Sequence, residues 1–143
     1  MKNKYTLPNM QHKIELQVKG EESGINWAGT FLYKRPSLQE RAMIDVMRTR
    51  LSGDLVNIDE DTSYYNEAIS HLRFTMKEYP EWWKDTGFGG ELYDANVIVE
   101  LYNEAMKFEA DWRSKTFGNE EGVQDGVEKK VEPATPVTEG PTA

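Results

Sequence analysis

The chain of 143 residues contains no cysteine and no long apolar run, and its basic side chains are few relative to its acidic ones. Without cysteine there is no disulfide framework, no thiol nucleophile and no thiolate metal site. No window approaches the roughly 18 apolar residues of a membrane span. The first residues lack the apolar core of a secretory signal. We therefore expect a soluble, intracellular protein.

The charge balance narrows the classes of partner. Seventeen Lys and Arg against 25 Asp and Glu give a net charge of −8. Such an excess of negative charge argues against general binding to nucleic acid or to an anionic membrane. We expect no membrane partner, and we rank nucleic acid low.

Groups that carry catalysis or bind cofactors are also scarce. The only histidines are His12 and His71, and no HExxH-type spacing exists. The acidic run 59–61 lacks the glycine and the distal glutamate of a calcium loop. The glycines at 87–90 lack the preceding buried strand and the Lys-Ser/Thr of a phosphate-binding loop. With no GxSxG or other nucleophile arrangement, we expect no metal, no cofactor and no enzymatic activity.

Composition changes after Phe117. Residues 118–143 contain three prolines, isolated valines and no aromatic residue, Leu, Ile or Met, and their net charge is −4. Such a segment buries too little apolar area to offset about 1–2 kcal/mol of ordering entropy per residue. The sequence therefore predicts one domain over 1–117, which holds every Trp, Tyr and Phe, followed by a disordered acidic tail over 118–143.

Period-two alternation predicts a β-hairpin over about 13–34. Ile14, Leu16 and Val18 alternate with polar neighbours, and the return run INWAGTFLYKR repeats the pattern. Turn-forming residues at 20–24 join the two runs. Gly29 leaves a gap in the apolar face, which indicates a bulge or a close backbone approach. Because a lone hairpin is marginal in water, we expect it to pack on the rest of the domain.

Three helices are predicted after the hairpin. Ser37 and Glu40 have the spacing of a capping box at the start of a helix over about 38–52. A second helix is predicted over about 62–79, where Pro80 either ends it or begins a new turn. A third, over about 91–115, carries a narrow apolar seam from Ile98 to Trp112. The predicted fold is α+β: an N-terminal β-hairpin packed on a small bundle of about three α-helices.

Two features are candidate protein-binding surfaces. Residues 34–50 carry a net charge of +3 in an otherwise acidic chain. They indicate either ion pairs along the helix surface or a basic face that meets an acidic partner or a second copy. In the block Tyr79–Trp83, adjacent tryptophans point in different directions, so they either both fill the core or leave one at an interface. From these features and the hairpin, the candidate protein-binding residues are Trp27, Phe31, Tyr33, Lys34, Arg35, Arg41, Arg48, Tyr79, Trp82 and Trp83.

The order of these pieces resembles the small tail assembly chaperones of tailed bacteriophages. The matching stretches are GTFLYKRPSLQERAMI (29–44), residues 68–83 with the Tyr-Pro-Glu-Trp-Trp block, and the acidic helix over 92–112, together spanning about 25–113. The resemblance implies a non-enzymatic protein of the host cell cytoplasm. Such a protein coats the long helical tape measure protein, which stays soluble while the tail tube polymerises around it. In many members a frameshift produces a longer form.

Other functions fit the same observations. A virion structural accessory protein, such as a head–tail or capsid component, would be found in purified particles. A nucleic-acid-modulating protein would use the basic residues of 34–50, and its binding would weaken steeply with salt. Binding of other virion proteins and assembly into a homo-oligomer are also compatible with the sequence.

Overall fold

The computed structural model describes the backbone of residues 9–53 and 57–134 and the side chains of 9–53 and 57–117. These residues form a three-stranded antiparallel sheet and four helices, which confirms the predicted α+β class. The chain divides between Phe108 and Glu109 into two compact units. The first unit contains the sheet, three complete helices and the beginning of the fourth.

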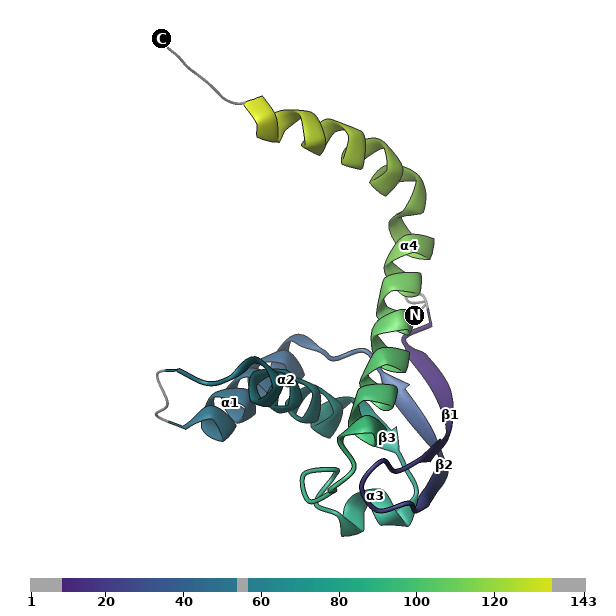
Figure 1. Cartoon of the computed structure of the whole chain (residues 1–143). Helices are drawn as coiled ribbons and strands as arrows, with labels where there is room; N and C mark the ends of the chain where they lie inside the picture. The colour runs from purple at the N-terminus through teal and green to yellow at the C-terminus, as the bar shows by residue number, and fades with distance from the viewer. Residues whose placement is uncertain (1–8, 54–56, 135–143) are drawn as a thin grey trace. The chain divides into compact units, whose positions relative to one another are not determined.

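The predicted hairpin is formed by β1 (Gln11–Lys19) and β2 (Asn26–Lys34), the first two strands of the sheet (Figure 1). Ile14 pairs with Phe31 and Leu16 pairs with Gly29. Since alternate residues of a strand share a face, this register places the apolar residues of both strands on one side. Ile14, Leu16, Phe31 and Tyr33 are all buried there. The alternation in the sequence therefore correctly identified the inward face.

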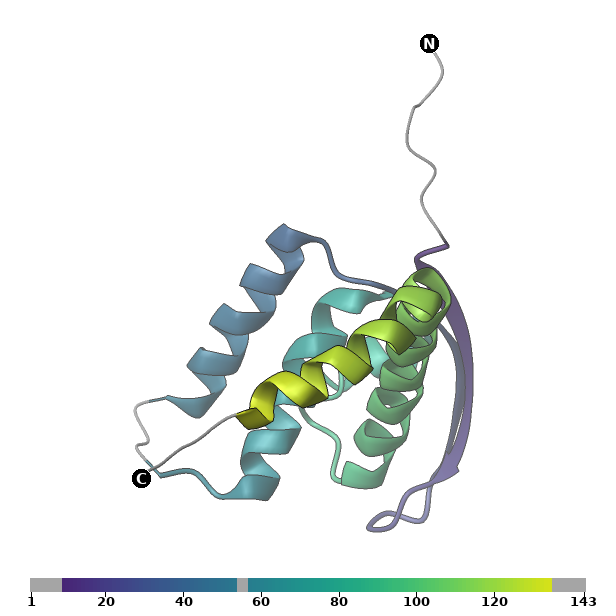
Figure 2. The same ribbon diagram turned by 90° about the horizontal axis from the view of Figure 1, so that it is seen from above.

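Helix α1 (Leu38–Ser52) has the predicted bounds, and both bonds of its capping box are present. The Ser37 hydroxyl accepts a hydrogen bond from the Glu40 amide at 3.2 Å, and the Glu40 carboxylate accepts one from the Ser37 amide at 3.0 Å. The helix ends at Gly53, whose positive φ of 64° favours glycine. Figure 2 shows α1 at the opposite side of this unit from the strands, with α2 (Glu60–Thr75) beside it.

The predicted second helix is too long at its carboxyl end. Helix α2 ends at Thr75, and Met76–Glu78 form β3, which pairs with β2 through Leu32–Glu78 and Tyr33–Met76. Pro80 explains the change, because a proline disfavours helical backbone in the residue before it. The extended residues then satisfy the otherwise unpaired edge of β2.

The predicted third helix begins four positions later than expected. Helix α4 (Ala95–Ala134) follows a series of turns in which Gly87, Phe88 and Gly89 all have positive φ. Its first turns contribute Val97, Ile98, Leu101 and Ala105 to the core, as the apolar seam predicts for the last three. The same core contains Leu72 of α2, Trp83 and the buried residues of the strands. A single core therefore joins the sheet, α2 and the beginning of α4.

The second unit continues α4 from Glu109. Phe117 has non-helical backbone angles, φ −120° and ψ 20°, which mark a kink. Within this unit the rings of Trp112 and Phe117 lie 6.2 Å apart, and Lys115 is 3.3 Å from Asp111. The tail predicted over 118–143 starts one residue after the kink. Residues 135–143 and all side chains after Phe117 lie outside the described residues. None of the helices in the described part of the chain has the length and apolarity needed to cross a membrane.

Candidate functional site

The Tyr79–Trp83 block lies on the hairpin. After Pro80 the chain begins the short helix α3 (Glu81–Asp85). The Trp82 indole donates a hydrogen bond from Nε1 to the Ala28 carbonyl at 2.8 Å, and the Trp83 ring meets Phe31 edge-on at 5.4 Å. A Cβ at Gly29 would stand 2.5 Å from the Pro80 ring, so the close approach predicted at Gly29 is made by this block. The block therefore fastens α3 to β2.

Three candidate binding residues are core residues. Phe31, Tyr33 and Trp83 have 0% exposure, so a partner cannot touch them in this fold, and their assignment to a binding surface is wrong. The physical reason is that the apolar face of the hairpin is the inner face of the domain. Trp27 and Trp82 are half-buried with their rings 4.7 Å apart, and Tyr79 retains 37% exposure.

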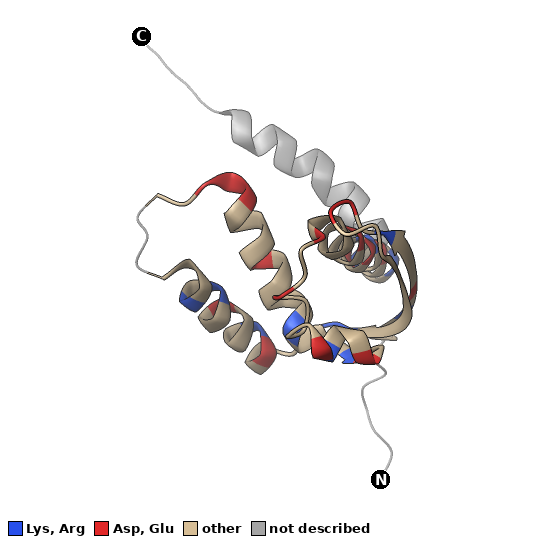
Figure 3. Ribbon diagram, turned by 60° about the horizontal axis from the view of Figure 1, so that its bottom comes forward, with Lys and Arg blue, Asp and Glu red and all other residues tan. Residues whose placement is uncertain are grey.

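The candidate cations do not share one free face. Arg48 forms an ion pair with Asp45 and lies 3.5 Å from Glu67, so it connects α1 to α2. Arg35 is half-buried, whereas Lys34 and Arg41 are exposed. Figure 3 shows Lys and Arg alternating with acidic residues along α1, and acidic residues at the start of α2. The net charge of 34–50 is therefore partly neutralised by structural contacts.

The apolar stripe of α1 is exposed. The exposed fractions of Met43, Val46 and Leu51 are 42%, 55% and 44%, and only Ile44 of this helix is buried. Ile44 lies beside the stripe on α1. The helix therefore packs with the side that carries Ile44 and exposes the stripe to solvent. An exposed contiguous apolar surface of this kind is a common mark of a protein-binding site.

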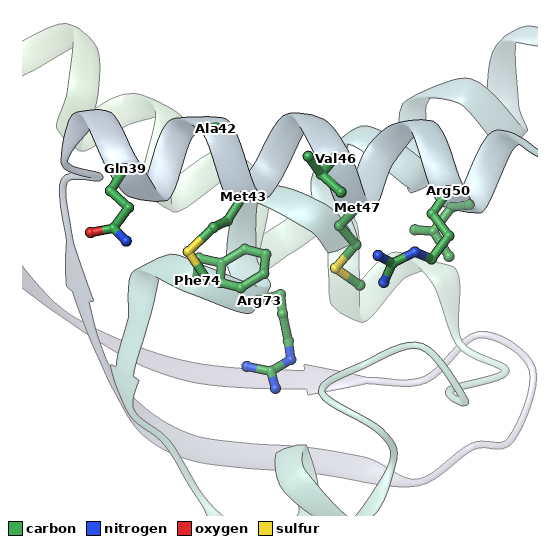
Figure 4. A pocket seen from close by; sticks show the side chains of 9 residues that line it. Gln39, Ala42, Met43, Val46, Met47, Arg50, Arg73 and Phe74 are labelled. Carbon is green, nitrogen blue, oxygen red and sulfur yellow. The ribbon is translucent and has the colours of Figure 1, made fainter.

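The stripe forms one wall of an open groove of about 590 Å³ (Figure 4). The end of α2 supplies the other wall through Arg73 and Phe74. Figure 4 shows the Met43 side chain reaching toward the Phe74 ring, with Met47 further along the same side of α1. The residues that line the groove are Gln39, Ala42, Met43, Val46, Met47, Arg50, Leu51, Arg73 and Phe74. We call this surface the α1 groove.

A second hollow continues the α1 groove toward β3. It shares Gln39, Met43, Arg73 and Phe74 with the groove and ends at Tyr79. Lys77 lies 2.5 Å from the Glu40 carboxylate at its rim. Partial burial tends to raise the pKa of Glu40, but the hydrogen bonds from Lys77 and from the Ser37 amide outweigh burial and lower that pKa. Glu40 thus stays ionised near neutral pH, and its ion pair with Lys77 adds no net charge to the rim.

Sequence reasoning missed Arg73 and Phe74. They lie one and two positions after Leu72, which is buried, so they fall outside the buried face of α2. A signal was present, because a phenylalanine off the buried stripe of a helix must pack elsewhere or meet a partner. The position of α1, which decides between these outcomes, cannot be read from periodicity.

The chemistry of the groove is that of a contact surface. Its polar groups are one amide and two guanidinium groups, and guanidinium groups do not exchange protons near neutral pH. Within the described residues, no group of three or more His, Asp or Glu side chains could hold a metal ion. No family model, no curated protein and no solved structure matches this chain.

Proposed function

We propose that this protein is a non-enzymatic assembly protein, similar in role to the phage tail assembly chaperones, that holds an amphipathic helix of a client protein in the α1 groove. The observation that carries the proposal is the exposed stripe of α1 beside Phe74. Amphipathic helices bind apolar grooves through anchors spaced three and four residues apart. Met43, Val46, Met47 and Leu51 have the same spacing and form a matching surface.

The side chains of the groove suit a chaperone. Methionine is unbranched and polarisable, so Met43 and Met47 can adapt to clients with different apolar side chains. A protein that coats a long helix needs such tolerance, because the apolar stripe of the client varies along its length. The net charge of −8 would keep the coated complexes apart.

The client implied by the resemblance is a long helical tape measure protein, and a co-expression experiment tests this assignment. The full chain is produced with the tape measure protein encoded in the same genome, and the soluble fraction of the client is measured. The wild-type chain should raise that fraction, whereas Met43→Glu combined with Val46→Glu should abolish the increase. Two carboxylates on this wall would place hydrated charges where the apolar stripe of the client must pack, and would so oppose its binding.

The matched control is Leu38→Glu, since Leu38 is 84% exposed on the same helix and does not line the groove. This variant should protect the client as well as the wild type does. Circular dichroism should show that all variants remain folded, because surface substitutions usually change stability by about 0.5 kcal/mol or less. Full protection by the Met43/Val46 double variant would contradict the proposal. Retention of the protein in purified particles would favour a virion accessory role.

A further inference from the structure

The α1 groove carries positive charge in an acidic protein. Arg50 and Arg73 line it, and the charged residues that line the adjoining hollow, Glu40 and Lys77, neutralise each other. Across the described side chains, neither Arg50 nor Arg73 has an acidic partner at ion-pair distance, whereas Arg48 has two. Among the described side chains, the groove thus has a charge of +2 with no carboxylate paired to it.

Arg73 is held in a position from which it can still bind an anion. Its guanidinium carbon lies 3.9 Å from the centre of the Phe88 ring and 5.6 Å from that of Phe74. A guanidinium group that stacks on a ring keeps its N–H donors in its own plane, at the edge, where a carboxylate can accept from them. The ring contacts therefore orient Arg73 without consuming its hydrogen-bonding capacity.

The length of the groove sets the size of the occupant. Gln39 and Leu51 both line it, and twelve residues of helix rise by about 18 Å. A partner helix of about three turns would cover this wall, with its apolar residues against Met43, Met47 and Phe74.

We propose that the occupant is an amphipathic helix of another protein whose apolar stripe is flanked by Asp or Glu. This inference rests on the proposed function and specifies the chemistry of the client. The carboxylates on one side of the stripe would meet Arg50 on α1, and those on the other side would meet Arg73 on α2. Opposite charges around an apolar contact select partners and their orientation more than they add affinity.

The charge of the groove disfavours a second copy of the chain as the occupant. In a two-fold dimer the same surface is used by both subunits, so α1 grooves facing each other would bring Arg50 and Arg73 of both copies together. The groove contributes no carboxylate that could neutralise them apart from Glu40, which Lys77 already binds.

Three synthetic peptides of about 20 residues, long enough to form helices, test the proposal. They share one apolar stripe and carry Glu, Gln or Lys at the flanking positions. Binding to the full chain is followed by fluorescence anisotropy. At low salt the Glu peptide should bind about tenfold more tightly than the Lys peptide. The ratio should approach one at roughly 1 M NaCl, where charges are screened beyond about 3 Å.

Variants of the full chain assign the preference to the two arginines. Arg50→Gln with Arg73→Gln should remove the preference for the Glu peptide while leaving binding of the Gln peptide unchanged. Arg50→Lys with Arg73→Lys keeps the charge and should retain most of the preference. Arg41→Gln is the matched control, since position 41 lies nine residues and thus about half a turn away from position 50 around the helix. It should bind all three peptides like the wild type.

Each other outcome contradicts the proposal in a distinct way. Equal binding of the three peptides would contradict the preference for an acidic client helix but would leave the proposed function intact. If none of the three peptides binds and the chain does not protect the tape measure protein, both the acidic client helix and the proposed function are contradicted. Binding of a peptide of residues 118–143 as tightly as the Glu peptide would assign the groove to the acidic tail. A dimer in light scattering that Met43→Glu and Val46→Glu dissociate would assign it to a second copy.

Discussion

The Asp94 carboxylate holds the turn between β1 and β2. Its oxygens accept hydrogen bonds from the amides of Glu22 and Ser23 at 2.7 and 2.8 Å, from the Ser23 hydroxyl at 2.6 Å and from the Trp27 indole at 2.8 Å. The residue is only 1% exposed, and a Cβ at Gly20 would lie 2.1 Å from the carboxylate. An aspartate just before a helix usually caps that helix. Asp94 instead binds the hairpin turn, which periodicity could not reveal.

We predict that Asp94→Asn lowers the thermal unfolding midpoint at pH 7 by several degrees, because an amide group would oppose the donors that now face a carboxylate. The Ser23 hydroxyl, and after it the Trp27 indole and the two amides, outweigh the effect of burial and lower the pKa of Asp94 from 3.8 to about 2. A pKa that is lower in the folded state stabilises the fold above pH 3.8, and this stabilisation is lost as the pH falls toward 2.

The difference in midpoint between the wild type and Asp94→Asn should therefore narrow between pH 4 and 2, since a protonated carboxyl resembles the amide. Thermal melts followed by circular dichroism across this range measure it. Asp85→Asn, at an exposed position, is the control and should leave the midpoint unchanged. A gap that stays constant down to pH 2 would show that the Asp94 charge does not stabilise the turn.

At the scale of the element, the patterns of the hairpin and of α1 predicted the structure correctly, whereas the end of α2 and the beginning of α4 were predicted wrongly. The hairpin faces follow the alternation of Ile14, Leu16 and Phe31, and the bounds of α1 follow from Ser37 and Gly53. The third strand could not be predicted, because Met76–Glu78 become extended only when the edge of β2 is present to pair with them. Its apolar residue, Met76, is buried either way, so periodicity does not distinguish the two structures.

Ile44 is the buried side chain of helix α1. Ile44 is 7% exposed and Val46, two residues away, is 55% exposed. We predict that Ile44→Ala lowers the free energy of unfolding by about 2–3 kcal/mol, since it removes buried methyl groups and leaves a cavity. Val46→Ala should change it by about 0.5 kcal/mol or less, as expected for a surface position. Urea denaturation measures both, and equal losses would mean that the stripe of α1 is covered in solution.

For the molecule as a whole, the exposed apolar stripe lies on α1 and not at the tryptophans where the sequence suggested an interface. Adjacent tryptophans suggested an interface at Trp82 and Trp83, yet β2 lies beside them and Trp83 is buried. The stripe of α1 was visible as an apolar pattern, but the same pattern describes a buried helix. Only the exposure of Met43, Val46 and Leu51 in the structure shows that the stripe faces solvent.

The described core lies between Ile14 and Ala105, and half of the net charge lies after Phe117. We predict that a chain ending at Phe117 keeps the thermal unfolding midpoint of the full chain to within about 2–4 °C, because the described core contains no residue after Ala105. Its net charge falls from −8 to −4, so it should precipitate at a lower protein concentration than the full chain, since charge repulsion keeps protein molecules dispersed. Light scattering over a concentration series measures this effect. A midpoint lower by about 10 °C or more would show instead that residues 118–143 help to hold the fold together.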